Sequence, residues 1–265
     1  MEKHQINKNW LTLETIDNII SSNVKIKLST ESTELVVKCR AYLDNKMSNN
    51  DSPIYGINTG FGSLCNTEIS NEDLGKLQRN LVMSHACGMG EEVPQNIVKL
   101  MLLLKIQGLS YGHSGVQLVT IQRLIDFYNN DVFPVVYQQG SLGASGDLAP
   151  LAHLVLPLLG LGEVNYLGNK ISGIELNKQM NWEEIDLQSK EGLALLNGTQ
   201  FMSAYGIHSL LRANKLSTLT DLVTAISIEA YDGRISPFND LVHKVRPHDG
   251  QLITARNIQM ALDGS

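Results

Sequence analysis

The chain has 265 residues, of which 43% are apolar, enough to bury the core of one large domain or two modest ones. The net charge of −6 disfavours nucleic acid or an anionic membrane surface as a partner. Cys39, Cys65 and Cys87 form no CxxC pair, so we expect neither a disulfide framework nor a cysteine zinc site. The polar N-terminus lacks a signal peptide, and the most apolar stretch, 148–161, is interrupted by Pro and Gly. We therefore expect a cytoplasmic protein that does not span a membrane.

Helical spacing of apolar residues dominates the chain and predicts a mainly α fold. A stripe of Leu35, Val36, Cys39, Tyr42 and Leu43 predicts a helix over 31–47. Further helices are expected after a Ser70–Asp73 start box, after Pro94 with an apolar run that indicates burial on most sides, over 200–231, and over 251–262. The long pattern over 200–231 is typical of a helical bundle.

Few segments predict strands. Val24, Ile26 and Leu28 alternate with polar residues, and residues 163–172 resemble a hairpin around Gly168-Asn169. No βαβ alternation is visible, which disfavours Rossmann and TIM-barrel folds. The polar, aperiodic segments 48–52 and 177–182 are predicted to be mobile loops.

One segment, Gly140–Pro150, is richer in glycine and small polar residues than ordinary packing requires. Its glycines permit backbone conformations closed to other residues, and a helix is expected to follow with Asp147 in its first turn. A nucleophile elbow does not fit, because position 147 is Asp where GxSxG needs glycine. A phosphate-binding loop does not fit either, because no Lys-Ser/Thr follows. A plain glycine-rich helix entrance remains one alternative.

A third chemistry suits Ala144-Ser145-Gly146. The amide nitrogen of Gly146, unhindered by a Cβ, could attack the carbonyl carbon of Ala144 and lose water to close a five-membered ring. Loss of a second water from Ser145 would leave an exocyclic methylene. The product would be methylidene-imidazolone, an electrophile made from the chain itself.

The motifs GSLGASGDLAPLAH (140–153), YGINTGFG (55–62), LQRNLVMSHACG (77–88), EGLALLNGTQ (191–200) and RPHDGQ (246–251) resemble, in order, those of the aromatic amino acid ammonia-lyases. The resemblance implies a helical bundle of the ammonia-lyase/fumarase-like type with a small N-terminal region and a short β-hairpin. It also implies a homotetramer and a methylidene-imidazolone formed from Ala144, Ser145 and Gly146, with no metal and no nucleotide. Residues 1–110 would form the N-terminal region with the catalytic tyrosine loop, and residues 111–265 the first part of the central bundle.

The same resemblance assigns roles to three further residues. Tyr55 would be the base that removes the β-proton, and Asn197 would bind near the substrate carboxylate. His85, beside Ser84, would contact the substrate ring, and Ser-His is frequent among histidine lyases. For each of the three, a purely structural role is the alternative: a buried tyrosine, a turn asparagine before the long helix, and a core histidine.

Family chains are about twice this length, and the arginine that binds the substrate carboxylate belongs to a second half not represented here. We therefore expect an N-terminal half whose parent eliminates ammonia from the small-molecule substrate L-histidine to give urocanate. A tyrosine or phenylalanine ammonia-lyase, or an aminomutase with the same cofactor, is the first alternative. An inert folding or assembly module is the second.

Overall fold

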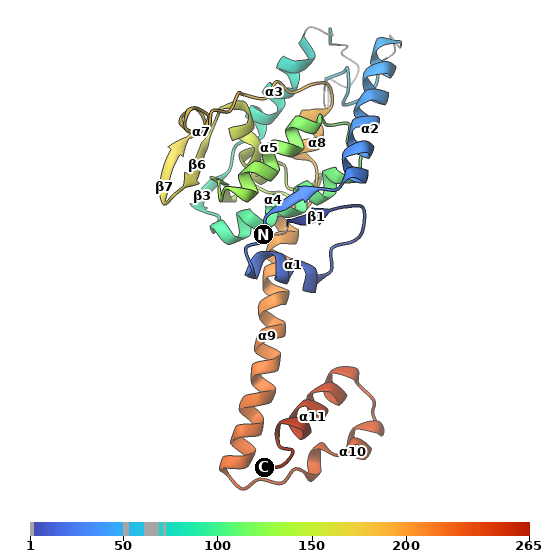
Figure 1. The fold of residues 1–265 in the computed structure, drawn as a ribbon, viewed down its shortest axis with the longest axis vertical. Helices are drawn as coiled ribbons and strands as arrows, with labels where there is room; N and C mark the ends of the chain where they lie inside the picture. The colour runs from blue at the N-terminus through green and yellow to red at the C-terminus, as the bar shows by residue number, and fades with distance from the viewer. Residues whose placement is uncertain (1–2, 50–52, 61–68, 71–72) are drawn as a thin grey trace. The chain divides into compact units, whose positions relative to one another are not determined.

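The computed structural model describes residues 3–49, 53–60, 69–70 and 73–265, which are mainly helical (Figure 1). The chain packs as two units, Met1–Gly206 and Ile207–Ser265. Cys65, the last two residues of the Tyr55–Gly62 motif and most of the 48–52 segment lie outside the described residues. The proposed division into 1–110 and 111–265 stays a prediction, although α4 (Gln95–Ser110) and α5 (Leu118–Asn129), on either side of it, pack together in the first unit.

The first unit begins with a minimal βαβ element, contrary to the expectation that none is present. Strand β1 (His4–Ile6) pairs in parallel with β2 (Ile26–Leu28), and α1 (Leu13–Ser21) connects them. The β2 alternation predicted this strand correctly, and Ile26 is buried. The partner strand was missed because only three residues of a polar segment form it.

Helices α2 (Thr30–Ser48) and α3 (Leu74–His85) confirm two predicted helices with corrected details. The Ser29 hydroxyl caps α2 by accepting a hydrogen bond from the Ser32 amide at 3.1 Å. Tyr42, placed on the predicted apolar stripe, is exposed; Arg40 occupies the buried face instead. The predicted start box does not cap α3: the Ser70 hydroxyl bonds the Asp73 carboxylate at 2.9 Å, and Asp73 makes no side-chain cap.

Helix α4 forms the centre of the first unit. The predicted burial on most sides is confirmed, since Val98, Met101, Leu103 and Ile106 point in different directions around the helix and are all buried. Because α4 is covered on most sides, the elements around it are held at fixed distances from one another. Lys105 is buried on this same helix.

Short strands complete the first unit. β3 (Met89–Glu92) pairs with β5 (Tyr137–Gln139), and β6 (Glu163–Tyr166) joins β4 (Phe133–Pro134) to β7 (Asn169–Ser172). The predicted hairpin is confirmed, but its turn is one residue earlier than expected. Leu167 and Gly168, with φ of 49° and 79°, form the turn, and Asn169 already pairs with Tyr166.

The prediction of a mobile loop over 177–182 was wrong. These residues include the end of α7 (Gly173–Met180), which Ser172 and Glu175 start with a reciprocal capping box. The Trp182 ring then packs beside Phe127 at 5.8 Å between centroids and under the Arg123 guanidinium at 4.7 Å. These contacts fix the end of the segment.

Helices α6 (Leu148–Val155) and α8 (Glu191–Leu196) flank the candidate site, and a 3-10 helix (Leu156–Leu159) follows α6. The predicted long helix is confirmed as α9 (Gln200–Ala230), whose first residues belong to the first unit.

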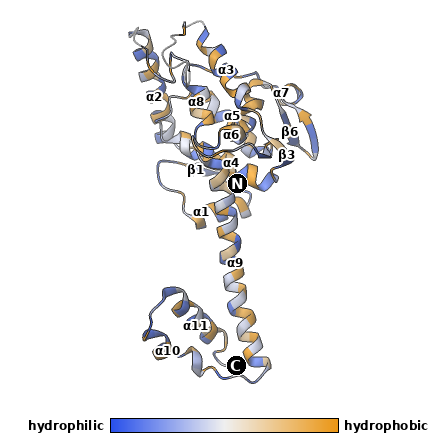
Figure 2. Ribbon diagram, turned by 180° about the vertical axis from the view of Figure 1, so that it is seen from behind, coloured by the Kyte–Doolittle hydropathy of each residue, from blue (hydrophilic) through white to orange (hydrophobic). Residues whose placement is uncertain are grey.

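The second unit contains the rest of α9, a 3-10 helix (Ser236–Phe238), α10 (Asp240–Lys244) and α11 (Asp249–Ala261). The Asn257 amide donates to the Asp221 carboxylate at 2.8 Å and links α11 to α9. Apolar residues recur along α9 (Figure 2), and Leu216, Leu219 and Ile226 are exposed. Across the described residues, none of the helices has the length and apolar character needed to cross a bilayer.

Candidate active site

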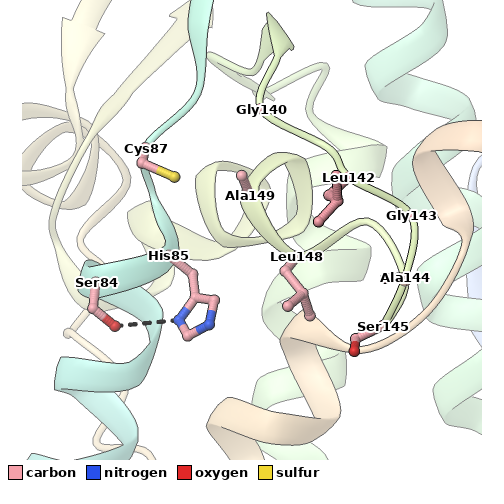
Figure 3. A pocket seen from close by; sticks show the side chains of 11 residues that line it. Ser84, His85, Cys87, Gly140, Leu142, Gly143, Ala144, Ser145, Leu148 and Ala149 are labelled. Atoms are coloured by element: carbon pink, nitrogen blue, oxygen red, sulfur yellow. Dashed lines mark hydrogen bonds between the residues drawn. The ribbon is translucent and has the colours of Figure 1, made fainter.

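A cavity of about 220 Å³ lies in the first unit between the end of α3 and the glycine-rich loop before α6 (Figure 3). This volume is large enough for several water molecules or one small organic molecule. Two predicted groups meet there: His85 on one wall and Ala144-Ser145-Gly146 on the other. The remaining lining residues are Ser84, Cys87, Gly140, Leu142, Gly143, Leu148 and Ala149.

The loop backbone is folded tightly at Ala144-Ser145-Gly146. Gly143 and Gly146 have φ of 80° and 94°, and the backbones of Ala144 and Gly146 form an isolated bridge. A Cβ built on Gly146 would lie 2.5 Å from the Gly198 carbonyl oxygen, so only glycine fits at this position. A close approach of residues 144 and 146, with no side chain on the latter, is what the cyclised group requires. These residues therefore fit methylidene-imidazolone.

Asp147 holds this loop to the start of α9. Its amide donates to the Gly198 carbonyl at 2.7 Å, and its carboxylate accepts from the Ser141 hydroxyl at 2.9 Å and the Met202 amide at 3.0 Å. Asp147 is only 2% exposed. The sequence suggested a favourable charge at the start of α6; the structure shows that the carboxylate instead caps α9.

His85 presents a hydrogen-bond acceptor to the cavity. Its Nδ1 lies 2.8 Å from the Leu81 carbonyl oxygen, which can only accept, so Nδ1 carries the proton in this contact. The Ser84 hydroxyl lies 3.2 Å from the same nitrogen (Figure 3). In the neutral ring Nε2 is then the acceptor. A ligand ring that donates from N–H or O–H would satisfy it, whereas a phenyl ring would not.

His153 of α6 contacts the segment that follows α3 and so stabilises the side of the cavity that carries His85. Its Nε2 accepts a hydrogen bond from the Gly88 amide at 3.0 Å, and its ring meets Tyr137 edge-on at 5.1 Å. Burial lowers the pKa of His153, which keeps the ring neutral and able to accept. These contacts give His153 a structural role.

Asn197 lies beside the glycine-rich loop but is not among the cavity-lining residues. It follows α8, its side-chain amide donates to the Leu193 carbonyl at 3.2 Å, and its neighbour Gly198 contacts Gly146. The buried Lys105 ammonium donates to the main-chain carbonyls of Ala194 and Asn197 at 2.9 and 3.0 Å. Burial lowers the pKa of Lys105 to about 7.

Tyr55 is 59% exposed and is not among the described residues that line the cavity. It lies on a turn in which Ile57 and Asn58 donate to the Ile54 carbonyl at 3.0 and 3.2 Å. The Asn58 side chain accepts from the Ile54 amide at 2.6 Å. The structure thus brings His85 and Ala144-Ser145-Gly146 to one cavity and places Asn197 beside the glycine-rich loop, while the roles of all these residues and of Tyr55 stay predictions.

Sequence reasoning missed Asp147 as a cap, Ser141 and Lys105. Asp147 and Lys105 act through contacts with segments far away in the chain, for which no local pattern exists, whereas Ser141 bonds Asp147 within the same loop. Within the described part of the chain, no group of three or more His, Cys, Asp or Glu residues could hold a metal ion.

Comparison with known proteins gives one consistent result. The family profile described as aromatic amino acid lyase matches residues 11–265. A histidine ammonia-lyase of Caldanaerobacter subterraneus subsp. tengcongensis is 42% identical over the whole chain, which spans 52% of that relative. Among solved structures, a histidine ammonia-lyase from Trypanosoma cruzi is similar with a TM-score of 0.89 and 35% identity, and a phenylalanine aminomutase from Pantoea agglomerans with 0.92 and 31%. The two matches include 97% and 99% of this chain, and 50% and 51% of the respective solved chains.

The chain thus spans about half the length of the relatives it matches. The helical fold, the ordered motifs and the matched profile agree, and the chain belongs to the aromatic amino acid lyase family.

Proposed function

We propose that this chain supplies part of an ammonia-lyase site that converts L-histidine to urocanate and ammonia, using a methylidene-imidazolone formed from Ala144, Ser145 and Gly146. One observation carries the proposal: His85 and this tripeptide line the same cavity, with the backbone of Gly146 held in a glycine-only conformation against Gly198. The cyclised group supplies an electrophile that makes the substrate amine a better leaving group.

The chain's own side chains would bind and orient the substrate. The Nε2 atom of His85 accepts a hydrogen bond from the imidazole N–H, which turns the substrate's β-carbon toward the loop. Asn197 donates to the carboxylate, and Tyr55 takes the β-proton. Leu148 and Ala149 line the cavity and would give the ring apolar contacts.

A second candidate function is supported by the same atom, Nε2 of His85. Because Nε2 of His85 accepts, it would take a phenol O–H as readily as an imidazole N–H, so L-tyrosine fits the same contact. A tyrosine lyase or an aminomutase, which returns the amine to the β-carbon, is therefore the alternative, and solved relatives include aminomutases. We further propose a cytoplasmic homo-oligomer, a tetramer as the resemblance implies.

Two measurements test the proposal. The intact mass of the purified chain should be lower than the encoded mass by two water molecules. A form of the protein that turns over substrate should then release urocanate from L-histidine, and product analysis with L-tyrosine distinguishes lyase from aminomutase. An unchanged mass contradicts the cofactor, whereas a reduced mass without turnover in any form of the protein, a form of full family length included, favours an inert assembly module.

A further inference from the structure

Lys105 is a buried cation outside the roles described above. It lies on α4, whose other buried residues are mostly apolar, and it is 2% exposed. An ammonium group loses its hydration when it is buried, and the loss must be offset by other contacts. Lys105 therefore requires a specific reason to be placed in the core.

Its contacts are confined to one short stretch of backbone. The Nζ atom donates to the Ala194 carbonyl at 2.9 Å and to the Asn197 carbonyl at 3.0 Å. Both carbonyls belong to the C-terminal end of α8, where the last carbonyls lack helical partners and the helix dipole attracts a positive charge. One group thus satisfies two such carbonyls.

The stretch held by Lys105 leads directly to the glycine-rich loop. Asn197 is followed by Gly198, whose carbonyl accepts from the Asp147 amide at 2.7 Å. The Gly198 backbone also occupies the space where a Cβ on Gly146 would stand. A shift of the Asn197 carbonyl would therefore be passed to Gly146, the residue whose nitrogen must reach Ala144.

We infer that Lys105 is a positioning residue that fixes the Asn197–Gly198 backbone, and through it the geometry of Ala144-Ser145-Gly146. The inference rests on the proposed cofactor chemistry. Without the two hydrogen bonds, the carbonyl of Asn197 is free to move, and the folded loop spends less time with residues 144 and 146 in reach of each other. Cyclisation then slows, and the Asn197 backbone no longer fixes the position of the Asn197 side chain.

The test follows the loss of two waters by intact mass at successive times after cell-free synthesis of the chain, because the group is covalent and a chain purified in its folded form would already carry it. Lys105→Met keeps the length and the apolar stem but removes the donors, and should slow cyclisation about tenfold or more, the effect of one charge-assisted hydrogen bond. Lys105→Arg restores donors and should recover much of the rate. If that variant does not fold, Lys105→Gln takes its place.

Ile97→Ala is the matched control. Ile97 is buried on the same helix, eight residues earlier and so about 12 Å along the axis. Its truncation lowers stability without touching the α8 carbonyls, so cyclisation should stay within about twofold of wild type once the chain is folded, as expected for independent sites.

Three results overturn the inference: Lys105→Met cyclises at the wild-type rate, Ile97→Ala slows cyclisation as much as Lys105→Met does, or neither Lys105→Arg nor Lys105→Gln recovers any rate. A wild-type chain that never loses two waters is a different outcome, because it contradicts the proposed cofactor itself and the inference falls with it.

Discussion

Substitution of two glycines in the same loop would show how tightly the loop packs on the Asn197–Gly198 segment. Gly143 and Gly146 both have positive φ, 80° and 94°, so an alanine at either position pays a similar backbone cost of about 1–2 kcal/mol. Their surroundings differ. A Cβ on Gly143 would meet nothing within 4 Å, whereas one on Gly146 would lie 2.5 Å and 2.9 Å from the Gly198 oxygen and nitrogen.

The difference between the two variants isolates the packing. Forcing a methyl group into a filled space costs typically about 1–3 kcal/mol, which adds to the backbone cost for Gly146→Ala alone. We expect Gly143→Ala to lower the free energy of unfolding by about 1–2 kcal/mol and Gly146→Ala by about 2–5 kcal/mol. Gly143→Ala is thus a matched control for backbone strain.

Urea unfolding followed by circular dichroism measures both free energies on the purified chain, and intact mass measures cyclisation in the same samples. Gly146→Ala should also prevent the loss of water, because its Cβ stands beside the nitrogen that must attack. Equal destabilisation by the two variants would refute the close packing of Gly146 on Gly198. Normal cyclisation of Gly146→Ala would refute the need for glycine at that position.

Four further outcomes are expected. Ser145→Ala should lose at most one water by intact mass, because no methylene can form, and its turnover should collapse in any form of the protein that is active. His85→Leu should lower histidine turnover relative to phenylalanine turnover by about 5- to 150-fold, the effect of losing one buried hydrogen bond of about 1–3 kcal/mol. Ser84→Ala is the control, and an unchanged ratio of the two turnovers in His85→Leu would make His85 structural. Burial lowers the pKa of Lys105 to about 7 from 10.5, so the unfolded chain binds more protons between these values. The free energy of unfolding should therefore rise from pH 7 to 9 by up to about 1.4 kcal/mol per pH unit, and Lys105→Met should flatten that rise. The 265-residue chain alone should show no urocanate formation by ultraviolet absorbance and should self-associate in solution, and turnover like that of a whole lyase would contradict this.

Elements with a long or strong apolar period could be predicted from the sequence. α4 and α9 are the clearest cases, since their apolar residues recur over many turns. α7 was missed although Ser172 and Glu175 form a capping box, because its eight residues contain few apolar positions and polar ones dominate the window. β1 has three residues, and its pairing with β2 depends on a tertiary contact that no local pattern records.

The candidate site divides in the same way. The glycine-rich loop and His85 carry their chemistry in their residue types, so motifs could find them. The groups that hold these parts in place could not be found, because their partners are main-chain atoms of distant segments. Met202, whose amide Asp147 caps, lies 55 residues further along the chain, and the Asn197 carbonyl bonded by Lys105 lies 92 residues away. A backbone carbonyl or amide has no residue type for a pattern to detect.

Lys105 and Asp147, two buried ionisable residues, bond neighbouring carbonyls of one short backbone stretch. The Lys105 ammonium holds the carbonyl of Asn197. The main-chain amide of Asp147 donates to the carbonyl of Gly198, and the Asp147 carboxylate caps the helix that begins two residues later. Glycine at 198 gives close approach but little conformational restraint of its own, so the restraint has to come from these bonds. Because Lys105 belongs to α4, which is buried on most sides, and Asp147 directly precedes α6, the position of the stretch is set by regular elements. Loss of either group should therefore affect Gly146 through Gly198, even though Lys105 does not line the cavity.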